Sequence, residues 1–119
     1  MPVACAVPEY VPGTPRLAGQ LPLRLEPGSR AHQLYGRLEV AETYTCSFEL
    51  NPAYRSRLEA AGLRFTGHDA DGVARLFELP GHPFCLGTSF LPQLRSAPGA
   101  PHPLIAAFVA AARRLDRRP

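Results

Sequence analysis

Short stretches of alternating apolar and polar positions predict several strands in this chain. The clearest is formed by Leu21, Leu23 and Leu25, which alternate with arginine and with Pro22, a residue that suits the edge of a sheet. The run 38–50 is rich in β-branched and aromatic residues and predicts one long strand or a strand with a bend. Further extended segments are expected at residues 3–7, 63–67, 73–79 and 84–90. The second and third of these form a hairpin, because Asp71-Gly72 is a favoured hairpin turn.

Capping residues mark three helices between these strands. Ser29 is expected to cap a short helix that Gly36 closes, and Asn51-Pro52 to begin a second that stops before Gly62. Pro103 begins the last helix, whose apolar residues fall on one face: Leu104, Ile105, Phe108, Val109, Ala112 and Leu115. Proline and glycine predict loops at residues 8–20 and an irregular segment at 91–101.

The chain has 119 residues, which is the size of one domain. The 14 prolines and 10 glycines predict many turns, and hydrophobic residues at 45% are enough for a folded core. We divide the chain into a Pro/Gly-rich N-terminal segment, residues 1–20, and one domain, residues 21–116. Whether Met1 is the authentic start stays open at this point.

The net charge of +3 comes from arginine alone, and four of the 13 arginines lie in the last seven residues. The rest of the chain carries 9 basic and 10 acidic residues and is close to neutral. The basic end is expected to complement the negative end of the last helix. It has no interleaved aromatic residues that would stack on bases, so nucleic-acid binding is the less favoured alternative.

Three cysteines without Cys-x-x-Cys spacing predict neither a disulfide framework nor a thiolate metal site, and we expect a reducing, cytoplasmic setting. No run of 18 apolar residues occurs, so no membrane segment is expected. The four histidines lack the spacing that presents two imidazoles to one metal. Phosphate-binding glycine loops and a GxSxG elbow are absent from the sequence, so no cofactor is predicted. A thiol and base pair from His82 and Cys85 is weighed against an inert buried thiol, which is the commoner outcome in an apolar strand.

Several separate stretches resemble the C-terminal half of the class I glutamine amidotransferase domain of CTP synthase. The run 42–51, ETYTCSFELN, aligns without gaps to the family's ERHRHRYEVN and keeps Glu42, Glu49 and Asn51. The run 89–94, SFLPQL, stands where the family has QFHPEF. Further matches follow in order, including Gly28-Ser29, Tyr35-Gly36, Tyr54-Arg55, Gly62-Leu63, Asp71-Gly72, Glu78-Leu79, His82-Pro83-Phe84, Pro103 and Phe108. The resemblance covers about residues 21–112.

In such a domain a cysteine on a strand-to-helix elbow attacks the glutamine amide, assisted by the histidine and glutamate of QFHPEF. Here the histidine position is Leu91 and the glutamate position is Gln93, and neither side chain supplies that chemistry. The family's arginines and histidines that hold the substrate are replaced over residues 44–47, and no elbow precedes residue 21. The resemblance therefore implies a degenerate site that is not active alone.

From this resemblance we expect an α/β fold, the latter half of a three-layer amidotransferase domain with a mixed sheet, flanking helices and a β-hairpin. The first hypothesis is a binding or regulatory module that holds a small neutral ligand, with a candidate pocket at Cys46, Phe48, Glu49, Leu91 and Gln93. The alternative is one half of a split amidotransferase-like enzyme, with Cys46 as the candidate nucleophile. If the chain is complete, the missing first half of the domain leaves a sheet edge and an apolar face uncovered, which predicts a homodimer or a partner chain.

Overall fold

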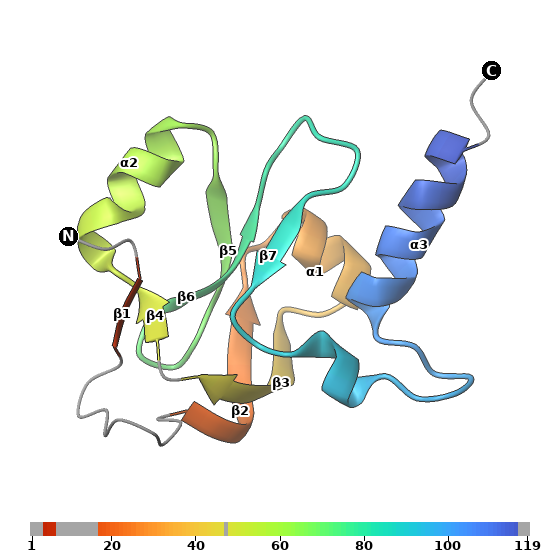
Figure 1. Ribbon diagram of the computed structural model, residues 1–119, viewed down its shortest axis with the longest axis horizontal. Helices are drawn as coiled ribbons and strands as arrows, with labels where there is room; N and C mark the ends of the chain where they lie inside the picture. The colour runs from red at the N-terminus through yellow and green to blue at the C-terminus, as the bar shows by residue number, and fades with distance from the viewer. Residues whose placement is uncertain (1–3, 7–16, 47, 117–119) are drawn as a thin grey trace.

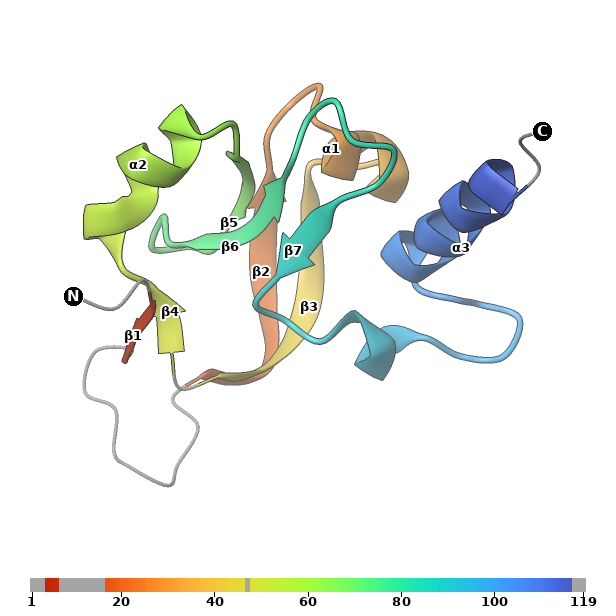
Figure 2. The ribbon, with the colours of Figure 1, turned by 45° about the horizontal axis from the view of Figure 1, so that its top comes forward.

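The computed structural model describes residues 4–6, 17–46 and 48–116, with strands and short helices alternating along the chain (Figure 1). The strands are β1 (Ala4–Ala6), β2 (Leu17–Leu25), β3 (Glu39–Cys46), β4 (Phe48–Leu50), β5 (Arg64–His68), β6 (Ala74–Glu78) and β7 (Leu86–Thr88). The helices are α1 (Arg30–Tyr35), α2 (Arg55–Ala60) and α3 (Pro103–Asp116), with 3-10 turns η1 (Pro52–Tyr54) and η2 (Pro92–Arg95). In both ribbon views α2 and α3 lie at opposite ends of the molecule (Figures 1 and 2).

The strands form a five-stranded sheet in the order β3-β2-β5-β6-β7 and a separate two-stranded sheet of β1 and β4. All strand pairs within the described ranges are antiparallel. The α/β class is thus confirmed, whereas the expected mixed sheet is corrected. The long predicted strand does bend: β3 pairs with β2, and after residue 47 β4 leaves for the smaller sheet.

Strand β2 differs from its prediction at two points. The predicted loop 8–20 is wrong for residues 17–20, which open β2, while residues 8–16 lie outside the described part of the chain. In strand order β2 is also an inner strand, not an edge. Pro22 is tolerated because β5 pairs with β2 only at Arg24 and Leu25, so only β3 pairs with the strand at Pro22.

The predicted helix starts and stops are confirmed where local capping chemistry sets them. Ser29 accepts a hydrogen bond from the N–H of His32 at 3.0 Å, and Gly36 closes α1 at a φ of 76°. Asn51 caps η1, which leads directly into α2. The prediction of an irregular segment over 91–101 is wrong for residues 92–95, where Pro92 begins η2.

The start of α1 is fixed by a buried carboxylate on the sheet. Glu78, 5% exposed, accepts hydrogen bonds from the backbone N–H of Arg30 at 3.2 Å and of Ala31 at 2.8 Å. Its Oε2 also accepts from the hydroxyl of Thr66 at 2.8 Å. Because the first N–H groups of a helix have no partner within the helix, this carboxylate both satisfies them and sets the direction of α1.

The core is a single cluster shared by the sheet, α1 and the start of α3. Its fully buried members are Leu23, Leu25, Ala31, Tyr44, Leu76, Phe90 and Leu104. The apolar face predicted for α3 is covered only in part: Leu104 is buried, but Phe108 is 56% exposed and Val109 and Leu115 are each 43% exposed. The prediction of Ala112 is wrong, since Ala112 is exposed and its neighbour Ala111 is buried instead. In the ranges that the structure describes, no helix has the length and apolar character needed to cross a membrane.

Candidate functional site

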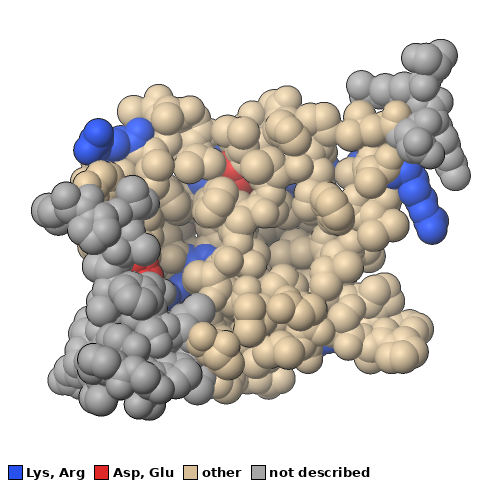
Figure 3. Space-filling model, in the orientation of Figure 1, with Lys and Arg blue, Asp and Glu red and all other residues tan. Residues whose placement is uncertain are grey.

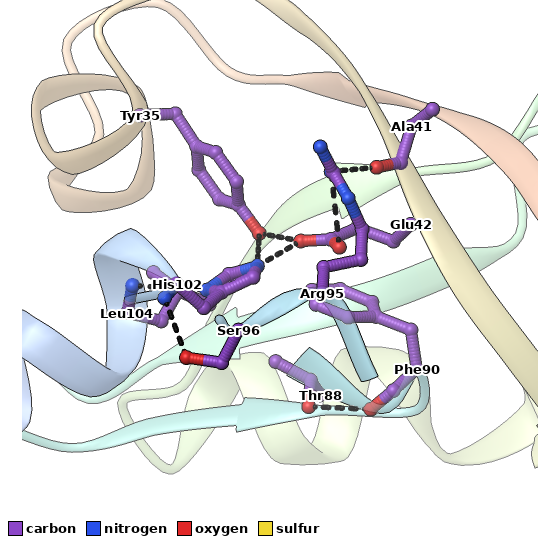
Figure 4. Close-up of polar contacts among 9 residues, drawn as sticks. All are labelled: Tyr35, Ala41, Glu42, Thr88, Phe90, Arg95, Ser96, His102 and Leu104. Atoms are coloured by element: carbon purple, nitrogen blue, oxygen red, sulfur yellow. Dashed lines mark hydrogen bonds and ion pairs between the residues drawn. The ribbon is translucent and has the colours of Figure 1, made fainter. Parts of the chain in front are cut away.

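A fully buried carboxylate, Glu42 on β3, is the centre of the main polar cluster of the molecule (Figure 4). Its neighbours in the strand explain its position, because Val40 and Tyr44 belong to the core and alternate residues of a strand point to the same face. A buried charge needs partners, and Glu42 has three: Tyr35 from α1, Arg95 from η2 and His102 just before α3.

His102 is in direct contact with the carboxylate, with Nε2 lying 2.5 Å from Oε2 of Glu42. Its other ring nitrogen, Nδ1, accepts a hydrogen bond from the backbone N–H of Leu104 at 3.1 Å, which assigns the proton of the neutral ring to Nε2. The backbone N–H of His102 donates to Oγ of Ser96 at 2.9 Å. The ring is therefore held at both nitrogens and at its backbone.

Tyr35 lies at the end of α1 and donates its hydroxyl hydrogen to Oε2 of Glu42. The hydroxyl oxygen is also 3.3 Å from Nε2 of His102, and the two rings meet edge to face. Burial, and then the hydrogen bond to the Glu42 carboxylate, raise the pKa of Tyr35 well above its ordinary value. The hydroxyl thus keeps its proton and acts as a donor at neutral pH.

Arg95 lies on the solvent-facing side of the cluster. Its Nη1 donates to the backbone carbonyl of Ala41 and lies 3.4 Å from Oε1 of Glu42. Since its side chain is 39% exposed, one edge of the guanidinium is anchored while the rest reaches solvent.

The histidine and glutamate of this cluster resemble a catalytic pair in composition but not in access. A general base needs a ring nitrogen that can reach the proton to be removed. Both nitrogens of His102 already have partners, and its side chain is 1% exposed. The arrangement instead joins α1, β3, η2 and the start of α3 through one charge.

Sequence reasoning missed this cluster, since it considered His102 only as a metal ligand. Glu42 and His102 are 60 residues apart, and no spacing rule connects them. The signal available was the carboxylate itself, which stands at a core-facing position of a strand between Val40 and Tyr44. Among the residues with a described placement, no group of three histidine, cysteine, aspartate or glutamate side chains is arranged to hold a metal ion.

The residues of the predicted pocket are only partly brought together. Leu91 is half-buried beside β3, where its backbone N–H donates to the carbonyl of Thr43 at 2.9 Å, and Gln93 is exposed on η2. Cys46 ends β3 and Phe48 begins β4, and the side chains of both lie outside the described part of the structure.

Glu49, the remaining predicted residue, is engaged with another strand. Its Oε2 lies 3.0 Å from Nη2 of Arg75 on β6, and Asp69 contacts the same guanidinium at 2.9 Å. Arg75 is 3% exposed, and its Nη1 has no hydrogen-bond partner among the described residues. The structure also describes the thiol and base pair weighed from the sequence, His82 and Cys85. Nδ1 of His82 accepts a hydrogen bond from the backbone N–H of Phe84 at 3.2 Å, and Cys85 is a half-buried free thiol.

Comparison with known proteins shows what this fold is similar to. The glutaminase domain of Trypanosoma brucei CTPS, solved with bound acivicin, matches with a TM-score of 0.78 and 27% identity, over 82% of this chain and 40% of that one. The fold is thus that of part of a glutaminase domain. No protein-family model matches the chain.

The chain is also similar in sequence to CTP synthases. The CTP synthase of Hyphomonas neptunium is 46% identical over 106 residues, and that of Saccharopolyspora erythraea is 50% identical over 103 residues. These matches cover 88% and 84% of this chain but only 19% and 18% of the relatives. The chain is homologous to the glutamine amidotransferase domain of CTP synthase, and it spans about a fifth of the length of these relatives.

Proposed function

We propose that this chain is a non-catalytic binding or regulatory module on a glutaminase-domain scaffold. The observation that carries the proposal is at η2, where the resemblance aligns Leu91 with a catalytic histidine and Gln93 with a catalytic glutamate. Leucine cannot transfer a proton, and a neutral amide cannot stabilise an imidazolium by charge. His102 does not replace the missing base, because its two ring nitrogens are already bonded inside the protein.

The charges around the predicted pocket favour a neutral ligand. The carboxylate of Glu49 is paired with the guanidinium of Arg75, while Leu91 and Gln93 carry no charge. A ligand with its own charge would lose its hydration without gaining an unpaired partner of opposite charge there. A small neutral molecule with amide groups would need only hydrogen bonds of the kind that Gln93 offers.

Two measurements test this proposal. Ammonia release from glutamine is measured for the chain and for a complete glutaminase domain of a CTP synthase as the positive control. We expect no release above the buffer blank from the chain, and glutamine turnover by the unmodified chain would refute the non-catalytic role.

The second measurement is an NMR titration with a neutral amide, N-acetylglutaminamide. We expect saturable shifts at the backbone amides of Leu91 and Gln93. The substitution Gln93→Ala should weaken them, whereas Gln33→Ala, at an exposed glutamine of α1, should not. Absence of saturable shifts at these amides refutes the ligand part of the proposal.

The alternative is half of a split amidotransferase-like enzyme, and the exposed apolar side of α3 favours it. Phe108 contacts Phe84, with ring centroids 5.7 Å apart, yet more than half of its side-chain surface is exposed, as is much of Val109 and Leu115. Large apolar side chains gathered on one element are typical of a surface that another chain covers.

If the chain is half of a split enzyme, mixing it with its partner should form a heavier complex and change the glutaminase activity. The partner would be a chain that carries the nucleophile elbow, or a second copy of this chain in the homodimer version. Light scattering should then report a complex, and glutaminase activity should appear only with the elbow-bearing partner. A Cys46→Ser variant tests the candidate nucleophile, and unchanged activity in that variant removes it. A stable monomer that gains no partner and no activity counts against the alternative.

A further inference from the structure

We propose that the cavity between Arg37 and Arg95 is a binding site for a small oxyanion, a carboxylate or a phosphate group. The cavity has a volume of about 300 Å³ and lies beside the Glu42 cluster. Its lining includes Tyr35, Arg37, Arg95, Pro101, His102 and Pro103. The inference does not rest on the proposed function, because it concerns a different set of residues from the predicted pocket.

The first argument is the balance of charge. Two arginines, Arg37 and Arg95, line the cavity, and Arg95 is paired with the carboxylate of Glu42. That carboxylate is already compensated by donors from Tyr35 and His102 as well as by Arg95. With His102 neutral, the site carries one positive charge in excess, which favours a ligand with one negative charge.

The second argument is that one arginine is held in place and the other is unpaired. Arg95 is fixed through Nη1 to the carbonyl of Ala41 and to Glu42, and no other nitrogen of its guanidinium has a partner within the described residues. Arg37 is exposed and forms no ion pair with a described acidic residue. Anchoring lowers the entropy lost when a side chain binds, and the planar fork of arginine matches the oxygens of carboxylate and phosphate.

The third argument is the shape and lining of the site. Pro101 and Pro103 form a rigid wall, and proline adds no backbone N–H donor that would need a partner. The Tyr35 hydroxyl and the His102 ring lie at the inner side, where both are committed to Glu42 (Figure 4). The free donors of the site are therefore the two arginines, so the ligand is recognised by its negative oxygens.

Two further arginines, Arg113 and Arg114, are neighbours on α3 and line a separate cavity together with Ile105 and Val109. The face drawn in Figure 3 is largely uncharged, with arginine side chains near α2 and near α3 at opposite ends. Arg64, exposed on β5, lines none of the cavities described for this chain and serves as a matched control for surface charge.

The experiment is isothermal titration calorimetry of the full chain with inorganic phosphate and, separately, with acetate. Chloride keeps the ionic strength constant in both titrations. We expect saturable binding of at least one probe. Arg37→Gln should weaken it about tenfold through loss of a charged hydrogen bond, and Arg37→Lys should weaken it less. Arg64→Gln should leave the dissociation constant unchanged. Stronger binding of phosphate assigns the site to phosphorylated compounds, and stronger binding of acetate assigns it to carboxylates.

Three outcomes would overturn the inference. They are no saturable binding of either probe, equal weakening by Arg37→Gln and Arg64→Gln, or no weakening by Arg37→Gln in a variant whose circular dichroism matches that of the parent. Because Arg37 is exposed and makes none of the contacts of the buried cluster, its substitution is expected to leave folding intact.

Discussion

The carboxylate of Glu42 is the most informative single position to perturb, because side chains from three other segments meet at it. A Glu42→Gln substitution keeps the shape and removes the charge. One amide oxygen cannot serve Arg95 and also accept from both Tyr35 and His102, as the two carboxylate oxygens do. The amide nitrogen then faces a donor in either orientation, and His102 cannot change its tautomer without losing its bond from Leu104.

The expected cost follows from the hydrogen bonds that are lost. A bond to a buried charged group contributes about 1.5–3 kcal/mol, so the loss of one or two gives a decrease of about 1.5–6 kcal/mol in the free energy of unfolding. With a urea m-value of about 1.5 kcal/mol/M, the midpoint falls by more than about 1 M. The assay is urea unfolding followed by circular dichroism.

The matched control is Glu39→Gln on the same strand. Glu39 pairs with Arg24 at 2.7 Å, but both side chains are mostly exposed, at 69% and 76%. An exposed pair of this kind contributes little, and its removal should leave the midpoint within error of the parent. If Glu42→Gln does not fold, Tyr35→Phe removes a single donor and should lower the midpoint by a smaller amount. Equal midpoints for the two glutamate variants would refute the role assigned to the cluster.

Three further changes test the local chemistry of the fold. Ser29→Ala removes the buried cap of α1 and should lower the free energy of unfolding by about 1 kcal/mol in the same urea assay. Gly87→Ala places a methyl group inside the ring of Phe77, its strand partner, and should lower the free energy of unfolding by about 2 kcal/mol or more. Adding Phe77→Leu to this variant should recover part of the lost stability. A Gly87→Ala variant as stable as the parent contradicts the packing. Burial, followed by the charge of Arg55, lowers the pKa of His68 below its ordinary value of 6.5, so the unfolded chain takes up a proton first as pH falls. Stability from this group is present above pH 6.5 and lost below it. In urea unfolding, a His68→Gln variant should therefore lose less stability between pH 7 and pH 5 than the parent does. The same pH dependence in the variant and the parent would argue against this.

Elements set by local chemistry could be predicted from the sequence, and those set by distant contacts could not. Asn51-Pro52 fixes a cap through neighbouring atoms, and the predicted hairpin is confirmed, with its turn running from Asp69 to Gly72. Residues 17–20 were expected to form a loop because of the prolines and glycines nearby, yet pairing with β3 keeps them in a strand. The pattern of local preferences contains no information about that partner.

In the candidate site, too, local motifs could be predicted from the sequence and distant contacts could not. The resemblance identified Leu91 and Gln93 from a motif of consecutive residues, and the structure places them at the start of η2. The contact between Glu42 and His102 depends on the path of the chain between them, which the sequence does not show. An apolar strand that contains a carboxylate at a core-facing position was nevertheless a sign that a buried partner had to exist.

The way in which α3 is attached has a consequence for motion. Few of its apolar residues are buried, mainly Leu104 and Ala111, while its first turn is tied to the rest of the protein through His102. We expect the helix to open as a separate cooperative unit, with its amides exchanging hydrogen together and sooner than those of β2 and β3. The contact between His102 and Glu42 must then break before the helix can separate from the rest of the protein, so its strength sets how often the helix opens.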